Sequence, residues 1–206
     1  MADRRIMIWG ALAAILVLVG GWLWLKPEAD RFAGCRRGTV AGGAGALGVP
    51  FTLTDENGER VTDRQVFAKP SLMYLGYTFC PDVCPLDSAR NAAAVDLLEE
   101  RGIEATPVFI SVDPRRDTPE QLRSFTDALH PRMIGLTGSE DEIAAVAKGW
   151  RHYFKLNDQE DKENYLVDHM TNTFLVLPGH GTVDFFGRDV SPGEMADRVA
   201  CFVGAA

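Results

Sequence analysis

The sequence predicts an α/β domain, a central sheet flanked by helices, preceded by an N-terminal apolar segment. Two observations predict this class. Apolar runs of strand length alternate with helical segments from Phe51 onward, and the chain closes with two strands and a helix. The length of 206 residues, less the apolar segment, suits one domain. The formal net charge of −8 is unlike that of nucleic-acid-binding domains, so no nucleic-acid role is expected.

The first apolar run, Ile6–Leu25, predicts a single transmembrane anchor. It is uncharged and about as long as the ~20 residues that a helix needs to span a bilayer. Arg4 and Arg5 precede it, and tryptophans lie near its far end. By the positive-inside rule, residues 1–5 are cytoplasmic and the domain lies in the periplasm, on the inner membrane of a bacterium.

A cleaved signal peptide and a lipoprotein are the competing interpretations of this N-terminus. Phe32–Cys35 resembles a lipoprotein cleavage box, but charged residues separate it from the apolar run, which such a box should follow directly. We therefore expect an uncleaved anchor over residues 6–25. Residues 26–48, charged at first and then rich in Gly and Ala, are expected to form a linker.

The folded domain is expected over residues 49–206, beginning with a β-hairpin. Phe51–Thr54 and Arg60–Thr62 flank Asn57-Gly58, a strong signal for a tight hairpin turn. Leu72–Tyr77 is continuously apolar, as expected of a strand buried on both faces.

The later elements alternate, and each carries a local signal. Helix starts are marked by capping residues or an early proline, and ends by glycine or loop residues. Helices are predicted from about Pro85 to Glu100, after Thr118, from Ser139 to Lys148 and from Ser191 to Val203; strands are predicted at Thr106–Val112, Met133–Leu136, Thr173–Leu177 and Thr182–Phe186.

Cys80 and Cys84 follow the buried strand Leu72–Tyr77 and open the next helix. A helix N-terminus carries partial positive charge, which favours the reactive, metal-binding thiolate. Residues four apart share a helical face, so both sulfurs could bind one ion or form a disulfide. With thiols after a central strand, a thioredoxin-like fold is predicted.

The chain has four histidines that could supply a third ligand. His130 at a helix end suits a capping or surface role, His152 a half-buried strand position, and His180 a solvated turn. His169 differs because it precedes the strand Thr173–Leu177, and in a thioredoxin-like sheet this loop approaches the cysteine helix. Two thiolates and one imidazole suit Cu(I) above all, and also Zn. Fewer than four ligands indicate an open or transferable site.

Four segments together resemble the Sco/SenC family. They are Gly76–Pro85, which holds both cysteines, Tyr165–His169, Ile110–Pro114 and Arg116–Pro119. The resemblance runs from about Val49 to Val203 and includes the anchor.

The resemblance implies a thioredoxin-like periplasmic domain that binds copper, Cu(I) and also Cu(II), through Cys80, Cys84 and His169. It implies a role in building the CuA centre of cytochrome c oxidase, as copper donor or thiol reductant. The implied partners are the oxidase subunit that bears CuA and other periplasmic copper chaperones or thiol reductants. Asp82 and Asp168 are candidates for contacts behind the ligands.

Two parts of the resemblance are less directly tied to chemistry. Leu86–Arg90 is less typical of the family pattern, which bears on partner contact rather than on the ligands. Asp113 and Asp117 are expected to shape a loop and a helix start.

Cys35 and Cys201 lie outside this motif. Two further thiols in an oxidising compartment predict a pair, so we expect a Cys35–Cys201 disulfide that tethers the linker to the last helix. Two free thiols, or a lipidated Cys35, are the alternatives.

Three functions remain open from the sequence. The first is a copper-binding assembly factor, mainly a metallochaperone. The second is an enzyme, first a thiol-disulfide oxidoreductase that cycles Cys80 and Cys84, and after it a peroxidase. The third is a redox or copper sensor that uses the same residues. His169 favours the first, because a simple thiol exchanger does not require it.

Overall fold

The computed structural model describes residues 8–9, 30–37, 44–157, 161 and 164–206. The chain divides into two units, Met1–Arg31 and Phe32–Ala206, and the second holds the domain. The anchor expected at Ile6–Leu25 lies outside the described residues except for Ile8 and Trp9. Within the described ranges, no helix combines the length and apolarity needed to cross a membrane.

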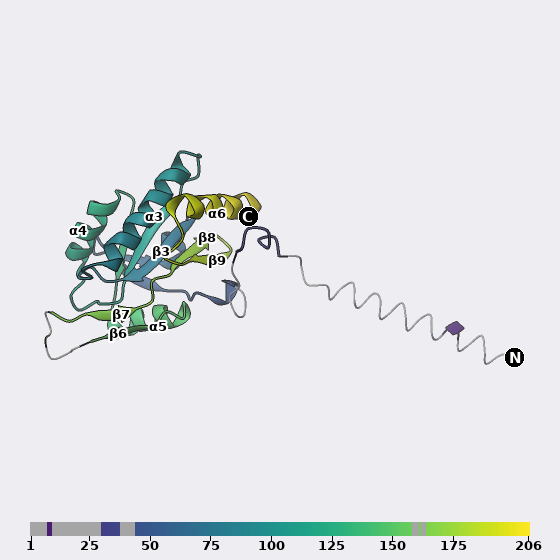
Figure 1. The fold of residues 1–206 in the computed structure, drawn as a ribbon. Helices are drawn as coiled ribbons and strands as arrows, with labels where there is room; N and C mark the ends of the chain where they lie inside the picture. Colours follow the sequence, from purple (N-terminus) through teal and green to yellow (C-terminus); the bar gives the residue numbers. More distant parts are fainter. Residues whose placement is uncertain (1–7, 10–29, 38–43, 158–160, 162–163) are drawn as a thin grey trace. The chain divides into compact units, whose positions relative to one another are not determined.

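A central mixed sheet organises the second unit, as the sequence predicts (Figure 1). Its seven strands run in the order β2-β1-β5-β4-β3-β8-β9. The strands are β1 (Thr52–Asp55), β2 (Arg60–Thr62), β3 (Ser71–Gly76), β4 (Thr106–Ser111), β5 (Ile134–Thr137), β8 (Thr173–Leu177) and β9 (Gly181–Phe186). β1 and β2 form the expected antiparallel hairpin, while β3, β4 and β5 are parallel neighbours.

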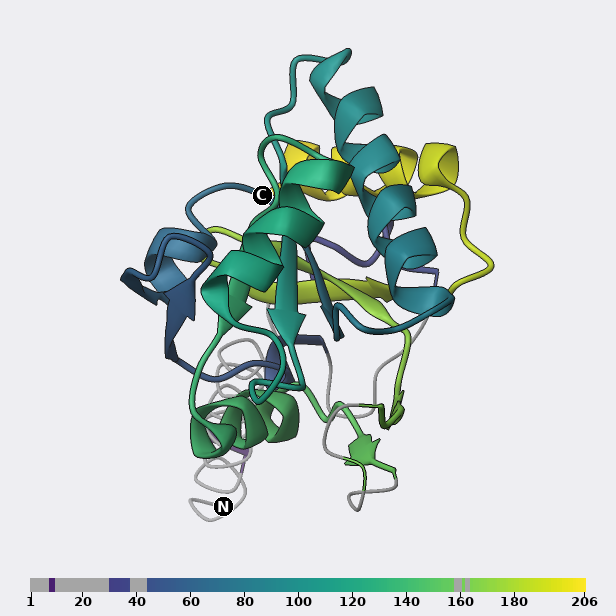
Figure 2. The ribbon, with the colours of Figure 1, turned by 90° about the vertical axis from the view of Figure 1, so that its left-hand side faces the viewer.

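Helices cover both faces of this sheet. The helices are α2 (Asp63–Val66), α3 (Val83–Glu99), α4 (Pro119–Leu129), α5 (Glu140–Gly149) and α6 (Pro192–Ala205), after a short 3-10 turn, η1 (Ala44–Ala46). Figures 1 and 2 show α3, α4 and α6 on one face and α5 on the other. The predicted caps are present, since the side chains of Thr118, Ser139 and Ser191 accept backbone N–H groups at the starts of α4, α5 and α6.

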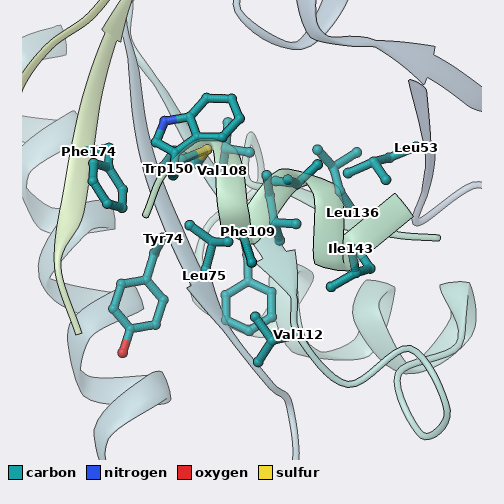
Figure 3. Packing of buried hydrophobic residues seen from close by; sticks show 14 of the residues in the cluster. Leu53, Tyr74, Leu75, Val108, Phe109, Val112, Leu136, Ile143, Trp150 and Phe174 are labelled. Atoms are coloured by element: carbon teal, nitrogen blue, oxygen red, sulfur yellow. The ribbon is translucent and has the colours of Figure 1, made fainter. Parts of the chain in front are cut away.

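β3 lies in the interior of the sheet, and all six of its residues are buried. Figure 3 shows Tyr74 and Leu75 of this strand among buried side chains from the neighbouring strands. Tyr74 stacks on Phe109 of β4 at 6.3 Å between ring centres. This packing fixes the end of β3, and therefore the turn that follows it.

A small second sheet lies apart from the main one. β6 (Phe154–Leu156) and β7 (Val167–His169) pair antiparallel, with Phe154 opposite His169. The sequence placed His169 in a loop before β8. The structure instead makes it the last residue of a strand, whose partner β6 holds its backbone in place.

Part of the expected linker 26–48 packs onto the domain, and another part, 38–43, lies outside the described residues. Phe32 is buried and contacts Phe202 of α6 at 5.4 Å between ring centres. Burial of a Phe side chain contributes about 1.5–3 kcal/mol. Cys35 and Cys201 are joined in a disulfide with their Cα atoms 5.7 Å apart. The chain before the domain is therefore tied to the last helix by apolar contact and by a covalent bond.

Candidate metal centre

The two cysteines lie where the end of β3 turns into α3. Asp82 occupies the N-cap position of α3, but within the described interactions its side chain makes no capping hydrogen bond. The Sγ of Cys80 instead accepts the backbone N–H of Cys84 at 3.3 Å. A sulfur therefore caps this helix, in the partial positive charge of its N-terminus, and the thiolate form is favoured.

The two thiols share one hydrogen bond, and their pKa values are shifted in opposite directions. The hydrogen bond from the Cys84 thiol is the main cause that lowers the pKa of Cys80 to about 4, and backbone N–H groups add to it. The same hydrogen bond, together with burial, raises the pKa of Cys84. Both cysteines are free and buried, Cys84 completely. Of the two sulfurs, Cys80 therefore ionises first, and Cys84 holds its proton more tightly.

His169, at the end of β7, is the third member of the group. Its Nδ1–H donates to the carbonyl oxygen of Met170 at 2.7 Å, and because a carbonyl can only accept, this bond assigns the proton to Nδ1. Nε2 is then the lone-pair nitrogen, and it lies 3.2 Å from the Sγ of Cys84. A histidine that binds a metal through one ring nitrogen usually donates a hydrogen bond from the other, as Nδ1 does here.

The ligand atoms of Cys80, Cys84 and His169 all lie within 4.8 Å of one another. Metal–sulfur bonds of about 2.3 Å and metal–nitrogen bonds of about 2.0 Å hold the donors of one ion roughly 3.5–4 Å apart, so only small side-chain movements are needed. Two sulfurs and one imidazole are a soft donor set, suited to Cu(I). The residues therefore fit a copper ion without rearrangement of the backbone.

The SCO1/SenC family profile matches residues 40–204. The chain belongs to the SCO1/SenC family. Protein SenC of Rhodobacter capsulatus is 54% identical over 198 residues, covering 95% of this chain and 89% of the relative.

Two solved structures with bound copper resemble this SCO1/SenC protein. ScoI of Arabidopsis thaliana is 38% identical with a TM-score of 0.73, and the match covers 77% of this chain and 99% of that one. ScoI of Bradyrhizobium japonicum is 35% identical with a TM-score of 0.68, covering 75% and 98%. Both are described as having copper bound, and the Cys-Cys-His group of this SCO1/SenC protein offers copper a site.

Aromatic rings enclose the ligand group of this SCO1/SenC protein. Tyr74 and Tyr77 both meet the His169 ring edge to face, at 6.1 and 5.7 Å between ring centres. Burial is the largest cause that raises the pKa of Tyr77 to about 12, and the neighbouring cysteine sulfurs add to it. The phenol therefore stays neutral, and the rings keep bulk water from the buried side of the site.

Arg116 links the segment before Cys80 to the segment before His169. Its Nε donates to Asp113 at 2.6 Å, and the hydroxyl of Tyr165 donates to the same carboxylate at 2.5 Å. The guanidinium lies 3.6 Å from the ring centre of Tyr165 and 4.8 Å from that of Phe79. This cluster holds the two ligand-bearing segments of the SCO1/SenC protein together, and the sequence did not identify Arg116 or Tyr165 as part of it.

Asp117 anchors the turn before Cys80. It accepts the backbone N–H of Thr78 at 3.0 Å, the Thr78 hydroxyl at 2.6 Å and the Ser111 hydroxyl at 2.5 Å. Burial raises the pKa of this carboxyl. Asp113 and Asp117 therefore both act on the shape of the loops, as expected from the sequence.

A buried polar network lies behind Cys84, and the sequence did not predict it. The hydroxyl of Tyr74 donates to Asp87 at 3.1 Å, and Nε of Arg188 donates to the same carboxylate. Asp87 belongs to the segment Leu86–Arg90 that is less typical of the family pattern. The available signal was its position three residues after Cys84, on nearly the same helical face.

The other candidate residues take varied places. His130 is the C-cap residue of α4, as the expected capping role predicts, but it is buried, and its Nε2 faces Asp96. His180 lies in an exposed turn, as expected. The expectation of a half-buried strand position for His152 is wrong, because His152 precedes β6 and is buried beside His169. Asp82 and Asp168 are both exposed.

Proposed function

We propose that this SCO1/SenC protein is a membrane-anchored periplasmic copper-binding protein of cytochrome c oxidase assembly. It holds copper on Cys80, Cys84 and His169 and delivers the ion to the CuA-bearing subunit, or reduces the cysteines of that site. The observation that carries the proposal is the three-ligand group itself, in which the Nδ1–H bond of His169 leaves Nε2 free toward the sulfurs.

Exposed apolar side chains beside the ligands support transfer to a protein partner. Phe79 directly precedes Cys80, Leu86 follows the second cysteine, and Met170 follows His169. These three residues are 47%, 59% and 37% exposed. Exposed apolar groups gathered at a site are typical of a docking surface. A partner that covers them would exclude water while copper passes from one ligand set to the other.

Copper binding and thiol chemistry exclude one another at this site. Metal ligation needs both sulfurs as thiolates, so a Cys80–Cys84 disulfide is a copper-free state. Binding of copper also releases the proton that the pair holds.

The lowered pKa of Cys80 favours a second candidate, thiol-disulfide reduction. The Cys80 thiolate would attack a partner disulfide, forming a mixed disulfide and releasing one partner thiolate. Cys84, after losing its proton, would then attack Cys80, releasing the second partner thiol and leaving a Cys80–Cys84 disulfide. Two electrons pass to the partner, and an external dithiol must return them.

One experiment separates these functions. The reduced and the oxidised full chain are each loaded with Cu(I), and bound copper is counted. The loaded protein is then mixed with an oxidase subunit whose CuA site is empty, and both copper content and partner thiols are measured. We expect one copper per reduced chain, none on the oxidised chain, and transfer without a gain in partner thiols.

Variants link that result to the site. Cys80→Ala, Cys84→Ala and His169→Ala should each lose stoichiometric copper, while the exposed His180→Ala serves as the matched control. Equal copper binding by all four variants would exclude the proposed ligands. Copper binding without transfer, together with rapid reduction of the partner's disulfide, would establish the reductase instead.

A further inference from the structure

His152 is a buried histidine whose ring nitrogens have no hydrogen-bond partner among the described residues. Its side chain belongs to a residue that is only 5% exposed, and its ring centre lies 6.1 Å from that of His169 with the two planes 25° apart. A buried polar group without a partner costs free energy, so its presence calls for an explanation.

The other buried histidine shows that burial alone does not leave the ring unpaired. His130 is 6% exposed, yet its Nε2 lies 3.2 Å from Asp96 and its Nδ1 accepts the backbone N–H of Arg132 at 3.0 Å. In His130, whose role is structural, both ring nitrogens therefore have hydrogen-bond partners. His152 keeps two nitrogens available, and it does so next to a copper ligand.

We propose that His152 is a fourth copper ligand, one that engages Cu(II) and not Cu(I). The proposal rests on the copper site of Cys80, Cys84 and His169. Bonds of about 2 Å from nitrogen to metal put two imidazoles on one ion with ring centres roughly 4.5 Å apart when they are cis and roughly 6.3 Å apart when they are trans. The 6.1 Å between His152 and His169 lies between these two values.

The backbone of His152 is anchored to α5, and a backbone hydrogen bond ties the segment that follows it to the segment of His169. The N–H of His152 donates to Ala147 at the end of α5, and the N–H of Met170 donates to the carbonyl of Tyr153. His152 is outside the group whose ligand atoms lie within 4.8 Å of one another. Ligation therefore requires a rotation of its side chain, and no hydrogen bond among the described residues holds the ring in its present orientation.

The two oxidation states of copper differ in what they need. Cu(I) is satisfied by soft sulfur ligands, whereas Cu(II) favours a tetragonal arrangement with nitrogen or oxygen donors. A second imidazole would complete a four-coordinate Cu(II) site with two sulfurs and two nitrogens.

Pulsed EPR of the Cu(II)-loaded full chain, with ¹⁵N-labelled histidine, tests this directly. We expect two coupled imidazoles in the unaltered protein and one in His152→Phe, which keeps a ring of similar shape and removes both nitrogens. The Cu(II) dissociation constant should rise by roughly tenfold or more, in line with the loss of a metal-site partner. The Cu(I) dissociation constant should not change.

The controls separate ligation from a structural role. His180→Phe removes an exposed imidazole and should leave both the spectrum and the affinities unchanged. Copper-free His152→Phe should melt no lower than the unaltered protein, because an unpaired buried polar group is removed. One imidazole in the unaltered protein would overturn the proposal while leaving the three-ligand site intact. Failure of the unaltered chain to bind any copper would overturn both.

Discussion

Gly76, the last residue of β3, lies against Cys84, one of the proposed copper ligands. A Cβ added there would lie 2.9 Å from the Sγ of Cys84 and 2.8 Å from a ring carbon of Tyr74. Normal carbon contacts begin at about 3.5 Å, so the sulfur must withdraw by roughly 0.6 Å. Metal-ligand bonds tolerate only about 0.2 Å. Gly76→Ala should therefore damage the copper site through an atom that never touches copper.

A second glycine provides a matched control for the cost of overpacking. A Cβ on Gly135 of β5 would lie 3.0 Å from Thr126 and 3.2 Å from Leu122, in a part of the core that contacts no ligand. Both alanine variants should lose about 1–3 kcal/mol of stability. For a domain of this size that is a melting temperature lower by roughly 2–12 °C.

Two measurements on the reduced full chain give the answer. Thermal melting of the copper-free protein reports the overpacking cost, and Cu(I) competition with a chelator reports the dissociation constant. Gly76→Ala should raise the Cu(I) dissociation constant by about tenfold or more, as for other damage next to a metal ligand. Gly135→Ala should leave it unchanged. Equal copper affinity in the two variants would refute the argument that Gly76 makes room for the ligand sulfur.

Three further predictions concern the Cys35–Cys201 disulfide, the Cys80 thiolate and the cluster of Asp113, Arg116 and Tyr165. Replacing Cys35 and Cys201 by Ala removes a bond across 166 residues; urea unfolding should show a loss of about 2–5 kcal/mol with copper binding retained. Alkylation of Cys80 by iodoacetamide should keep its rate as pH falls from 8 and slow only near pH 4, because its pKa is lowered to about 4. A lowered pKa also means that the thiolate's contribution to stability is complete above the ordinary thiol value of about 8.5 and is lost as pH falls toward 4. Tyr165→Phe removes a hydroxyl that donates to the buried Asp113 and should cost about 1–3 kcal/mol in thermal unfolding, with a weaker hold on His169 and lower copper affinity.

Each of these has a control within the chain. Reduction of the disulfide in the unaltered protein should reproduce the double alanine variant, and equal stability with and without the bond would contradict the first prediction. Cys84→Ala removes the main hydrogen bond to Cys80 and should move the alkylation midpoint upward, so an unshifted midpoint would disprove the shared proton. Tyr153→Phe changes an exposed tyrosine and serves as the control. If Tyr165→Phe behaves the same way, the role of the Asp113 cluster in holding His169 is disproved.

Local patterns were enough to predict most of the fold. Strand length, alternation with helices and capping residues depend on neighbours in sequence, so β1, β3, β4 and β8 lie close to their predicted ranges. His169 is the exception, because its strand β7 exists only through pairing with β6, a partner that its own sequence does not indicate.

For the site, too, the sequence and the tertiary structure supply different information. The sequence by itself determined the ligand types: two cysteines at a helix start and one histidine ahead of a late strand, in a pattern shared with the SCO1/SenC family. Only the tertiary structure decided the surroundings of these ligands. The proton shared by Cys80 and Cys84 depends on burial and on the distance between atoms. The His152 ring, which has no hydrogen-bond partner within the described part of the chain, depends on how β6 and β7 pack. Those quantities arise when segments far apart in the chain meet, and no local pattern of residue types records them.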